Sequence, residues 1–282
     1  MTVNEYFRQA CAELGTALGS EAEGEAAARI VLEDVAGYDR KYLFMYPDRE
    51  LLDETRQRIQ AVVDSIKAGE PVQYAVGRAR FMGMDFKVTP DVLIPRPETE
   101  GLCDMIVRDA DGRSDLRVLD IGTGSGCIAV SLARALPFAQ VDAMDVSTAA
   151  LAVARENAQQ LGAKVNFIQD DILTAKAPEA YYDIIVSNPP YVCRSEEVDM
   201  DERVSDREPA LALFVPDDDP LKFYRAICRY ASRGLKPGGR LYFEINSRFP
   251  EEMRRLMEDE GFTDVDVTRD YKGNYRFASG KR

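Results

Sequence analysis

The sequence predicts an α/β protein with a mainly parallel, seven-stranded sheet, preceded by a small helical domain. From Leu116 onward, short apolar runs alternate with helical patterns, which indicates βαβ units and a sheet with helices on both faces. Before about Gly69, apolar residues recur at helical spacing instead. With 282 residues, the chain is long enough for two domains of the usual ~100–200 residues each.

The first part of the chain reads as a bundle of amphipathic helices. Two sets of apolar residues recur at i, i+3, i+4 and i+7, and each set forms one helix face: Ala28, Val31, Leu32 and Val35, and then Ile59, Val62, Val63 and Ile66. We assign residues 1–75 to this bundle. Residues 76–97 are predicted to form a hairpin around Gly83 and a stiff, proline-containing linker, and residues 98–282 the sheet domain.

The sheet domain contains seven runs that predict strands. Five of them alternate with helices: "LRVLDI", "AQVDAMDV", "KVNFIQ", "YDIIVS" and "GRLYFEI". Two later runs, "FTDVDVT" and "YRFAS", are predicted to add edge strands. The segment "KPGGR" predicts a turn before Leu241, and Pro97 followed by Glu98 and Glu100 predicts the first turn of a helix.

The composition excludes several kinds of chemistry. The chain has no histidine, which rules out His-based catalytic triads and His-ligated metals. Its five cysteines show no CxxC spacing, which argues against a zinc site or a disulfide framework and suits a reducing cytoplasm. The start lacks a signal-peptide pattern, and charge breaks every long apolar stretch, so we expect a cytoplasmic protein without a membrane span. The net charge of −13 argues against nucleic acid as the partner.

A glycine-rich segment, "VLDIGTGSGCIAV", joins the first predicted strand to its helix. Gly122, Gly124 and Gly126 alternate there, and glycine lets the backbone approach a ligand closely. A GxGxxG fingerprint would require glycine at Cys127, so the dinucleotide-binding pattern is not met. Taken alone, the segment is compatible with a cofactor loop, a plain strand–helix turn or an NAD site.

Acidic residues follow the next two predicted strands. Asp145 lies ~20 residues beyond the last glycine, where an acid can accept hydrogen bonds from ribose hydroxyls. Asp171 and Ile172 follow the third strand, where an acid can accept from an adenine amino group and an aliphatic side chain can pack on the ring. The alternative for Asp171 is a helix N-cap.

The order D-x-G-x-G-x-G, then Asp145, then Asp171, then NPPY resembles the class I S-adenosylmethionine-dependent methyltransferases. The resemblance implies a Rossmann-like fold, S-adenosylmethionine as cofactor, S-adenosylhomocysteine as product, and no metal. It places the methionine moiety against the glycine loop, and Asp120 would help to fix that end of the cofactor. The alternative role for Asp120 is that of a capping acid for the loop.

The segment "SNPPY" ends the fourth predicted strand at the same edge of the sheet. The Asn188 side-chain oxygen and the Pro189 carbonyl can accept hydrogen bonds from a planar amino group. Pro189 and Pro190 have no N–H to compete and hold the turn rigid. The Tyr191 ring can stack on the planar group and favour a cationic methyl group nearby. These residues fit adenine and glutamine equally well, and a strand end followed by a plain turn is the alternative.

Other segments favour glutamine. "PVQYAVGRARFMG", "VLIPRPETE", "SNPPY", "REPALALF" and "DYKGNYR" occur in this order, and with the helical N-terminus they resemble the bacterial protein-(glutamine-N5) methyltransferases, known as HemK or PrmC. The resemblance implies that the substrate is the glutamine of the GGQ motif in class 1 peptide chain release factors, docked by the helical domain. We expect the enzyme to be a monomer. A structural or dimerising bundle is the alternative for that domain.

The resemblance also assigns site residues. The substrate turn falls on Asn188, Pro189, Pro190 and Tyr191, and the cofactor contacts fall on Asp120, Gly122, Thr123, Gly124, Ser125, Gly126, Asp145, Asp171, Ile172 and Asn188. Two positions depart from the family pattern, since relatives often have an aromatic residue in place of Ile172 and a glycine in place of Asn246. The acidic stretch 193–219 is either a lid or a solvated loop.

Three other functions remain open from the sequence alone. The nearest is a glutamine N5-methyltransferase that acts on a ribosomal protein. An adenine-N6 nucleic-acid methyltransferase would use the same NPPY turn, although the acidic chain argues against it. A non-catalytic regulator would bind S-adenosylmethionine without turnover.

Overall fold

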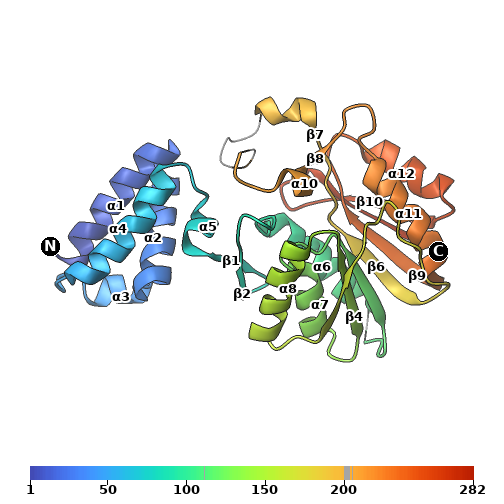
Figure 1. The fold of residues 1–282 in the computed structure, drawn as a ribbon, viewed down its shortest axis with the longest axis horizontal. Coiled ribbons are helices and arrows are strands. Elements are labelled where there is room, and N and C mark those ends of the chain that lie inside the picture. Colours follow the sequence, from blue (N-terminus) through green and yellow to red (C-terminus); the bar gives the residue numbers. More distant parts are fainter. Residues whose placement is uncertain (111, 200–203, 205) are drawn as a thin grey trace. The chain divides into compact units, whose positions relative to one another are not determined.

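The chain separates into two compact units in the computed structural model, which describes residues 1–110, 112–199, 204 and 206–282 (Figure 1). The first unit comprises Met1–Arg78 with Asp201–Arg207, and the second comprises Ala79–Met200 with Glu208–Arg282. Among the described residues, no helix is both long and apolar enough to span a membrane. The same residues contain no group of three or more Cys, Asp or Glu side chains arranged to hold a metal ion.

The first unit is a helical bundle, as the helical periodicity predicted. Thr2 begins it with a capping box, because its hydroxyl accepts from the backbone N–H of Glu5 while the Glu5 side chain accepts from Thr2. The first two helices approach closely at Gly24, where a Cβ atom would lie 2.4 Å from the Gly15 Cα atom. The helices are α1 (Val3–Leu18), α2 (Glu21–Ala36), α3 (Arg40–Met45), α4 (Asp53–Lys67) and α5 (Val72–Val76).

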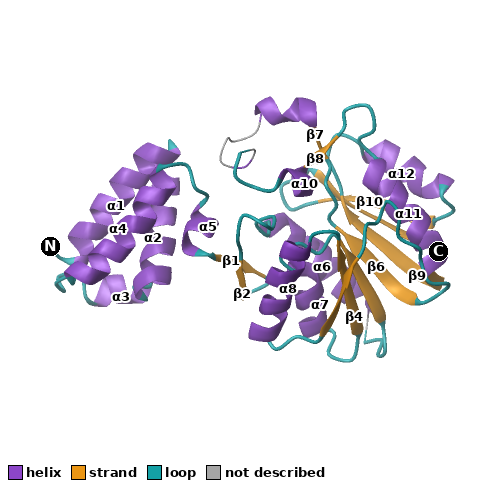
Figure 2. Cartoon of the chain, in the orientation of Figure 1, coloured by secondary structure: helices purple, strands orange, loops and turns teal. Residues whose placement is uncertain are grey.

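The second unit is built on a seven-stranded sheet with the order β10-β11-β9-β6-β3-β4-β5 (Figure 2). Five adjacent strands are parallel, and the last two along the chain pair antiparallel at one edge. This arrangement confirms the predicted mainly parallel, seven-stranded sheet. The strands are β3 (Arg117–Ile121), β4 (Gln140–Asp145), β5 (Val165–Gln169), β6 (Tyr182–Ser187), β9 (Leu235–Glu244), β10 (Thr263–Arg269) and β11 (Tyr275–Lys281).

Two hydrophobic clusters fill the faces of this sheet. One contains Leu102 of α6 and Val130 of α7, and the other contains Ile227 of α11 and Met253 of α12. Alternate strand residues point to opposite faces, so Val118 joins the first cluster and Leu119 the second. The helices are α6 (Pro97–Ala110), α7 (Cys127–Ala135), α8 (Thr148–Gln160), α11 (Lys222–Gly234) and α12 (Pro250–Asp259), and the start of α6 at Pro97 is as predicted.

The sheet corrects one expectation. The segment "KPGGR" was predicted to form a turn before Leu241, but it lies inside β9. The pairing of β9 with β6 jumps from Tyr182↔Leu235 to Ile184↔Arg240, which makes the segment an irregularity within the strand. Gly238 has φ 82°, a conformation that glycine adopts without strain.

Shorter elements flank the sheet. The predicted hairpin forms around Gly83 from β1 (Arg78–Phe81) and β2 (Met84–Lys87). Within the acidic stretch 193–219, the described parts include the 3-10 helix η1 (Arg194–Asp199), the helix α10 (Ala210–Leu213) and a parallel pair of short strands, β7 (Val192–Cys193) and β8 (Phe214–Val215). Residues 200–203 and 205 of this stretch lie outside the described residues.

Candidate active site

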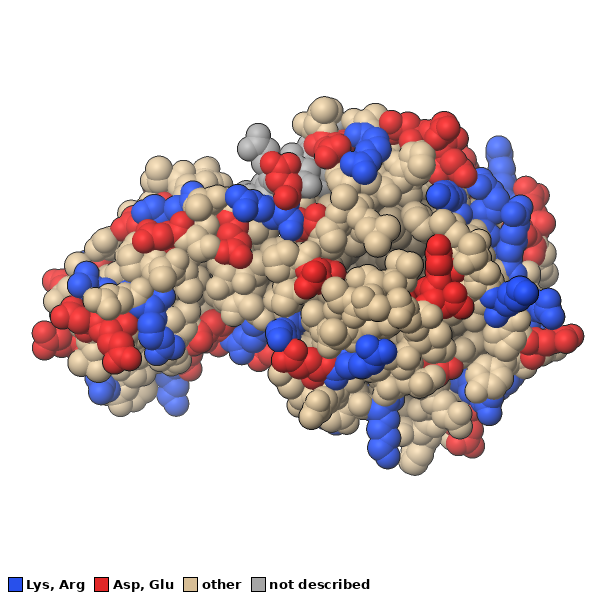
Figure 3. Space-filling model, viewed as in Figure 1, with Lys and Arg blue, Asp and Glu red and all other residues tan. Residues whose placement is uncertain are grey.

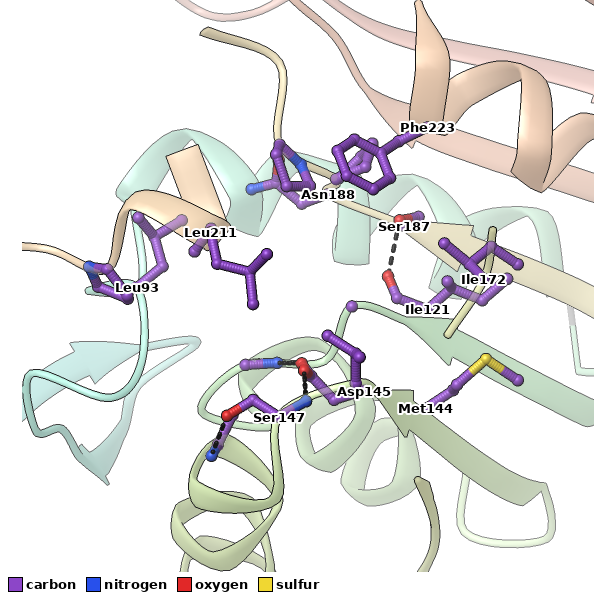
Figure 4. Close-up of a pocket in the computed structure, with 18 of the residues that line it drawn as sticks. Leu93, Ile121, Met144, Asp145, Ser147, Ile172, Ser187, Asn188, Leu211 and Phe223 are labelled. Atoms are coloured by element: carbon purple, nitrogen blue, oxygen red, sulfur yellow. Dashed lines mark hydrogen bonds between the residues drawn. The ribbon is translucent and has the colours of Figure 1, made fainter. Parts of the chain in front are cut away.

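Four parallel strands end at one edge of the sheet, and a cleft opens there (Figure 4). The register places Ile121, the last residue of β3, beside Met144 of β4 and Ser187 of β6. The Ser187 hydroxyl donates a hydrogen bond to the Ile121 carbonyl at 2.6 Å and ties the two strand ends together. Ligands of open parallel sheets bind at this edge.

The glycine loop forms part of the cleft wall. Gly122 and Gly124 line the cleft with φ of 73° and 54°, and a Cβ atom added at either position would meet nothing within 4 Å. The backbone therefore faces open space, which a ligand can approach closely. Gly126 does not line the cleft, and a Cβ atom there would lie 3.0 Å from the Cβ atom of Ala154, so this glycine allows α7 and α8 to pack closely.

Asp120 lies behind the loop and is fully buried. Its Oδ2 atom accepts hydrogen bonds from the Thr123 hydroxyl at 2.6 Å and from the Ala129 N–H at 3.2 Å. Its Oδ1 atom is buried without a hydrogen-bond partner among the described residues. Burial raises the pKa of this carboxyl to about 7. Asp120, Thr123 and Ser125 do not line the cleft. The hydrogen bonds of Asp120 therefore stabilise the conformation of the loop.

Asp145 lies at the carboxyl end of β4 and lines the cleft. Its Oδ2 atom accepts from the Gly124 N–H and its Oδ1 atom from the Ser147 N–H, both at 2.9 Å (Figure 4). Burial raises the pKa of the carboxyl, while the two N–H groups oppose that effect. Each carboxylate oxygen has a further lone pair, so the group can still accept hydrogen bonds from a ligand hydroxyl.

Asp171 and Ile172 follow β5 and also line the cleft. The Asp171 Oδ1 atom accepts from the Leu173 N–H at 2.9 Å, which is the pattern of an Asx turn. Residues 170–181 contain no helix, so the helix N-cap alternative for Asp171 does not apply. The aspartate shapes a turn and still faces the cleft.

The turn after β6 brings Asn188, Pro189 and Pro190 to the cleft. The Asn188 Nδ2 atom donates to the Thr99 hydroxyl at 3.4 Å. Tyr191 does not line the cleft in this structure, and its hydroxyl donates to the Glu244 Oε1 atom at 3.1 Å. Burial, with the Glu244 charge second, raises the pKa of this phenol. Of the four residues in the turn, three face the cleft and the fourth joins the buried network beside it.

The cleft includes residues to which the sequence assigned no role. One wall comes from residues 91–93, just before "IPRP". Another comes from residues 209–212 of "REPALALF", and Glu208 of the same motif connects the two walls. Glu208 is buried, and its carboxylate accepts hydrogen bonds from the Arg96 guanidinium at 2.6 Å and from the Ile94 N–H at 3.2 Å. Both motifs carried the family resemblance in the sequence, but the sequence did not predict that Arg96 and Glu208, which are 112 positions apart, form a pair. The lining residues missed are Asp91, Val92, Leu93, Ile121, Met144, Val146, Ser147, Ala150, Asp170, Ser187, Pro209, Leu211, Ala212, Phe223 and Ile227.

The fold and cleft together define a class of enzyme. Residues 102–205 match the family model described as "Methyltransferase small domain". A 16S rRNA N2 G1207 methyltransferase from T. thermophilus, solved with AdoMet and guanosine, superposes with a TM-score of 0.54 and 21% identity, over 73% of this chain and 49% of that one. A methyltransferase from Pyrococcus furiosus gives a TM-score of 0.51 and 18% identity, over 79% of this chain and 96% of that one. The chain is a Rossmann-like, S-adenosylmethionine-dependent methyltransferase.

Closer relatives define the family. Residues 5–77 match the "PrmC N-terminal domain" model. The chain is 45% identical over 262 residues to a release factor glutamine methyltransferase of Bacteroides thetaiotaomicron, covering 92% of this chain and 93% of the relative. It is 40% identical over 279 residues to the protein of that name from Flavobacterium psychrophilum, covering 98% of each. The chain belongs to the release factor glutamine methyltransferase family.

Proposed function

We propose that the protein transfers a methyl group from S-adenosylmethionine to the side-chain amide nitrogen of the glutamine in the GGQ motif of class 1 peptide chain release factors. The observation that carries the proposal is that Asn188 shares one cleft with the glycine loop and Asp145. The relatives, at 40% identity or more across both units, are named for this reaction and support the choice of substrate. We place the reaction in the cytoplasm and treat the enzyme as a monomer.

The cofactor end of the cleft has the groups that S-adenosylmethionine needs. Gly122 and Gly124 present backbone with open space in front of it, which suits the methionine moiety. Asp145 offers free lone pairs for the ribose hydroxyls, and Asp171 with Ile172 offers an acceptor and an apolar surface for adenine. Asp120, Thr123, Ser125 and Gly126 would act on the cofactor only through the shape of the loop.

The substrate end favours an amide nitrogen. When bound, S-adenosylmethionine supplies an electrophilic methyl group on a sulfonium centre. An amide nitrogen attacks poorly because its lone pair is delocalised, so the site must place and polarise it. The Asn188 Oδ1 atom and the Pro189 carbonyl can accept its two N–H groups, and the prolines hold both acceptors still. The methylated nitrogen then releases a proton to water, so the reaction has no need of a histidine.

The helical unit is proposed to dock the release factor. Its support is a group of exposed apolar side chains at α3 and the segment after it. Phe44 is 86% exposed and Leu52 is 68% exposed. Met45 and Tyr46 are also exposed. Apolar and aromatic side chains that the bundle leaves in water are the kind that dominate protein interfaces.

Mass spectrometry of a purified release factor tests the function. The release factor is incubated with the enzyme and S-adenosylmethionine, and the added methyl group is located by fragmentation. We expect it on the glutamine of the GGQ motif, and no labelling of a release factor in which alanine replaces that glutamine. Parallel reactions with ribosomal proteins and with nucleic acid separate the alternatives. Methylation of either of these, but not of the release factor, would overturn the proposal.

A further inference from the structure

Glu244, the last residue of β9, joins three segments next to the cleft. It is buried, with 1% of its surface exposed. Its Oε2 atom accepts from the Thr99 hydroxyl of α6 at 2.6 Å, and its Oε1 atom accepts from the Tyr191 hydroxyl at 3.1 Å. Thr99, also buried, in turn accepts from the Asn188 Nδ2 atom at 3.4 Å. The carboxylate is thus linked to both ends of the NPPY turn.

When Glu244 is ionised, the count of protons fixes the direction of this chain of hydrogen bonds. Thr99 has one hydroxyl proton, and an ionised carboxylate can only accept, so that proton points to Glu244. The Thr99 oxygen then presents only lone pairs to Asn188. A reversed amide would set two acceptors, the Asn188 Oδ1 atom and the Thr99 oxygen, against each other. The amide nitrogen therefore faces Thr99, and the Oδ1 atom is left for a ligand.

We propose that Glu244 is a positioning residue, which acts through Thr99 to orient the Asn188 amide so that its oxygen accepts the substrate. This inference rests on the proposed function for the identity of the substrate. It gives a role to the threonine of "PETE" and the glutamate of "YFEI", which lie 145 residues apart in sequence. The second oxygen of the carboxylate holds Tyr191 and with it the other end of the turn.

Several charged and titratable groups face Glu244. Burial raises the pKa of this carboxyl, and Glu98 of α6 adds to the rise. Thr99, Arg276 of β11 and the Tyr191 hydroxyl oppose it. Tyr224 of α11, which donates to the Glu244 backbone carbonyl, and Cys127 of α7 are further titratable groups on which the Glu244 charge acts. A protonated Glu244 could donate to Thr99, and the Thr99 hydroxyl could then donate to Asn188, which would reverse the amide.

The first test replaces Thr99. Thr99→Val keeps the size of the side chain and removes the hydroxyl, so we expect kcat for release factor methylation to fall about tenfold or more. Cofactor affinity, measured by calorimetry, should stay near wild type because Gly122, Gly124 and Asp145 are untouched. Thr99→Ser restores the hydroxyl and should recover most of kcat. Thr263→Val, an exposed threonine on β10, is the matched control.

The second test replaces Glu244. Glu244→Gln is isosteric but carries N–H donors, so either amide orientation becomes possible at Asn188. We expect a fall in kcat similar to that of Thr99→Val. In the wild type we expect the rate to fall in acid as Glu244 becomes protonated, and we expect Glu244→Gln to lose this acid limb. Tyr191→Phe removes only the second contact and should keep the acid limb. If Glu244→Gln does not fold, the threonine variants and the wild-type pH profile still decide the matter.

A readout that needs no substrate separates this inference from the proposed function. In nitrogen-15 spectra of the whole protein, the Asn188 side-chain amide is the signal pair that Asn188→Ala removes. We expect the amide proton that faces Thr99 to exchange with water more slowly in the wild type than in Thr99→Val. Slow exchange in an enzyme that fails to methylate a release factor would overturn the substrate alone. Unchanged exchange and unchanged kcat in Thr99→Val would overturn the role of Glu244.

Discussion

Asn188 supplies the acceptor oxygen of the proposed site. In Asn188→Ala the oxygen and the amide contact to Thr99 are both lost, so we expect turnover to fall ~10²–10³-fold, as when one oxyanion donor is removed. Cofactor affinity should fall much less, because Gly122, Gly124 and Asp145 remain. Initial rates and calorimetry measure the two effects. Asn166→Ala, an exposed asparagine on β5, is the control, and a folded Asn188→Ala enzyme with near-normal rate would remove Asn188 from the mechanism.

Asp120 makes stability depend on pH. Its pKa is about 7 in the folded protein against 3.8 for the free side chain, so the folded state binds the extra proton between these values. The contribution of Asp120 to stability is therefore greatest below pH 3.8 and falls as pH rises to about 7, by about 4 kcal/mol at ~1.4 kcal/mol per pKa unit. Asp120→Asn should remove this part of the slope. Urea unfolding of both proteins from pH 4 to pH 8 measures it, and parallel curves would contradict the assignment.

Glu208, a buried carboxylate, connects the segment that carries α10 to Arg96 and Ile94 on the neighbouring wall of the cleft. Glu208→Gln removes the charge that pairs with Arg96, whose side chain is 31% exposed, so we expect a loss of about 2 kcal/mol rather than the cost of a fully buried pair. The backbone amide protons of residues 208–213 should exchange with water faster in Glu208→Gln than in the wild type. Cofactor affinity should fall a few-fold, because Pro209, Leu211 and Ala212 line the cleft.

The control for Glu208 is a glutamate elsewhere in the same unit. Glu258→Gln changes an exposed side chain on α12 and should leave the exchange of residues 208–213 at the wild-type rate. Protection of that segment in Glu208→Gln equal to wild type would show that other contacts hold the wall in place.

The surface at α3 tests the docking role of the helical unit. Phe44→Ser with Leu52→Ser removes two exposed apolar side chains and should raise KM for the release factor about fivefold or more, the effect of losing ~1 kcal/mol of binding. The melting temperature and kcat should not change, because neither residue is in the core. Phe138→Ser, which is 73% exposed in the sheet unit, is the control. A wild-type KM in the double variant would favour a purely structural bundle.

The elements that the sequence predicted well are those with local signals. Helical spacing identified the bundle, Pro97 marked the start of α6, and Gly83 marked the hairpin. The irregularity in β9 was missed because Pro237 and the glycines after it are equally typical of a turn, and only pairing with β6 distinguishes the two. A local sequence pattern therefore predicts that a helix or strand exists better than it predicts how that strand pairs with its neighbour in the sheet.

The site shows the same division. The glycine loop and the NPPY turn are contiguous motifs, and each brings some of its residues to the cleft: Gly122 and Gly124 from the loop, and Asn188, Pro189 and Pro190 from the turn. The links of Glu208 to Arg96 and of Glu244 to Thr99 join residues more than 100 positions apart, and spacing alone cannot pair them. The direction of the Tyr191 side chain could not be predicted from its motif, because its hydroxyl donates to Glu244, which belongs to a strand distant in the sequence.

At the scale of the whole molecule, charge is spread over both units. Acidic and basic side chains are interspersed on the face shown in Figure 3, and the acidic residues outnumber the basic ones by 49 to 36. A surface of this kind does not favour a polyanion, in keeping with a protein substrate. Methylation rates should therefore depend on salt far less steeply than those of enzymes that neutralise many phosphates.

The two units have separate hydrophobic cores, so a cofactor should stabilise only one of them. Val31, Leu32 and Ile59 belong to a cluster formed wholly by the first unit, while the cleft is lined wholly by the second. S-adenosylhomocysteine at ~100 times its Kd should stabilise the second unit by about 2.7 kcal/mol. Hydrogen exchange with mass spectrometry should then show protection in β3, β4 and α7 and unchanged exchange in α1, α2 and α4. Asp145→Ala should weaken the protection at the same ligand concentration, and equal protection of both units would mean that they unfold together.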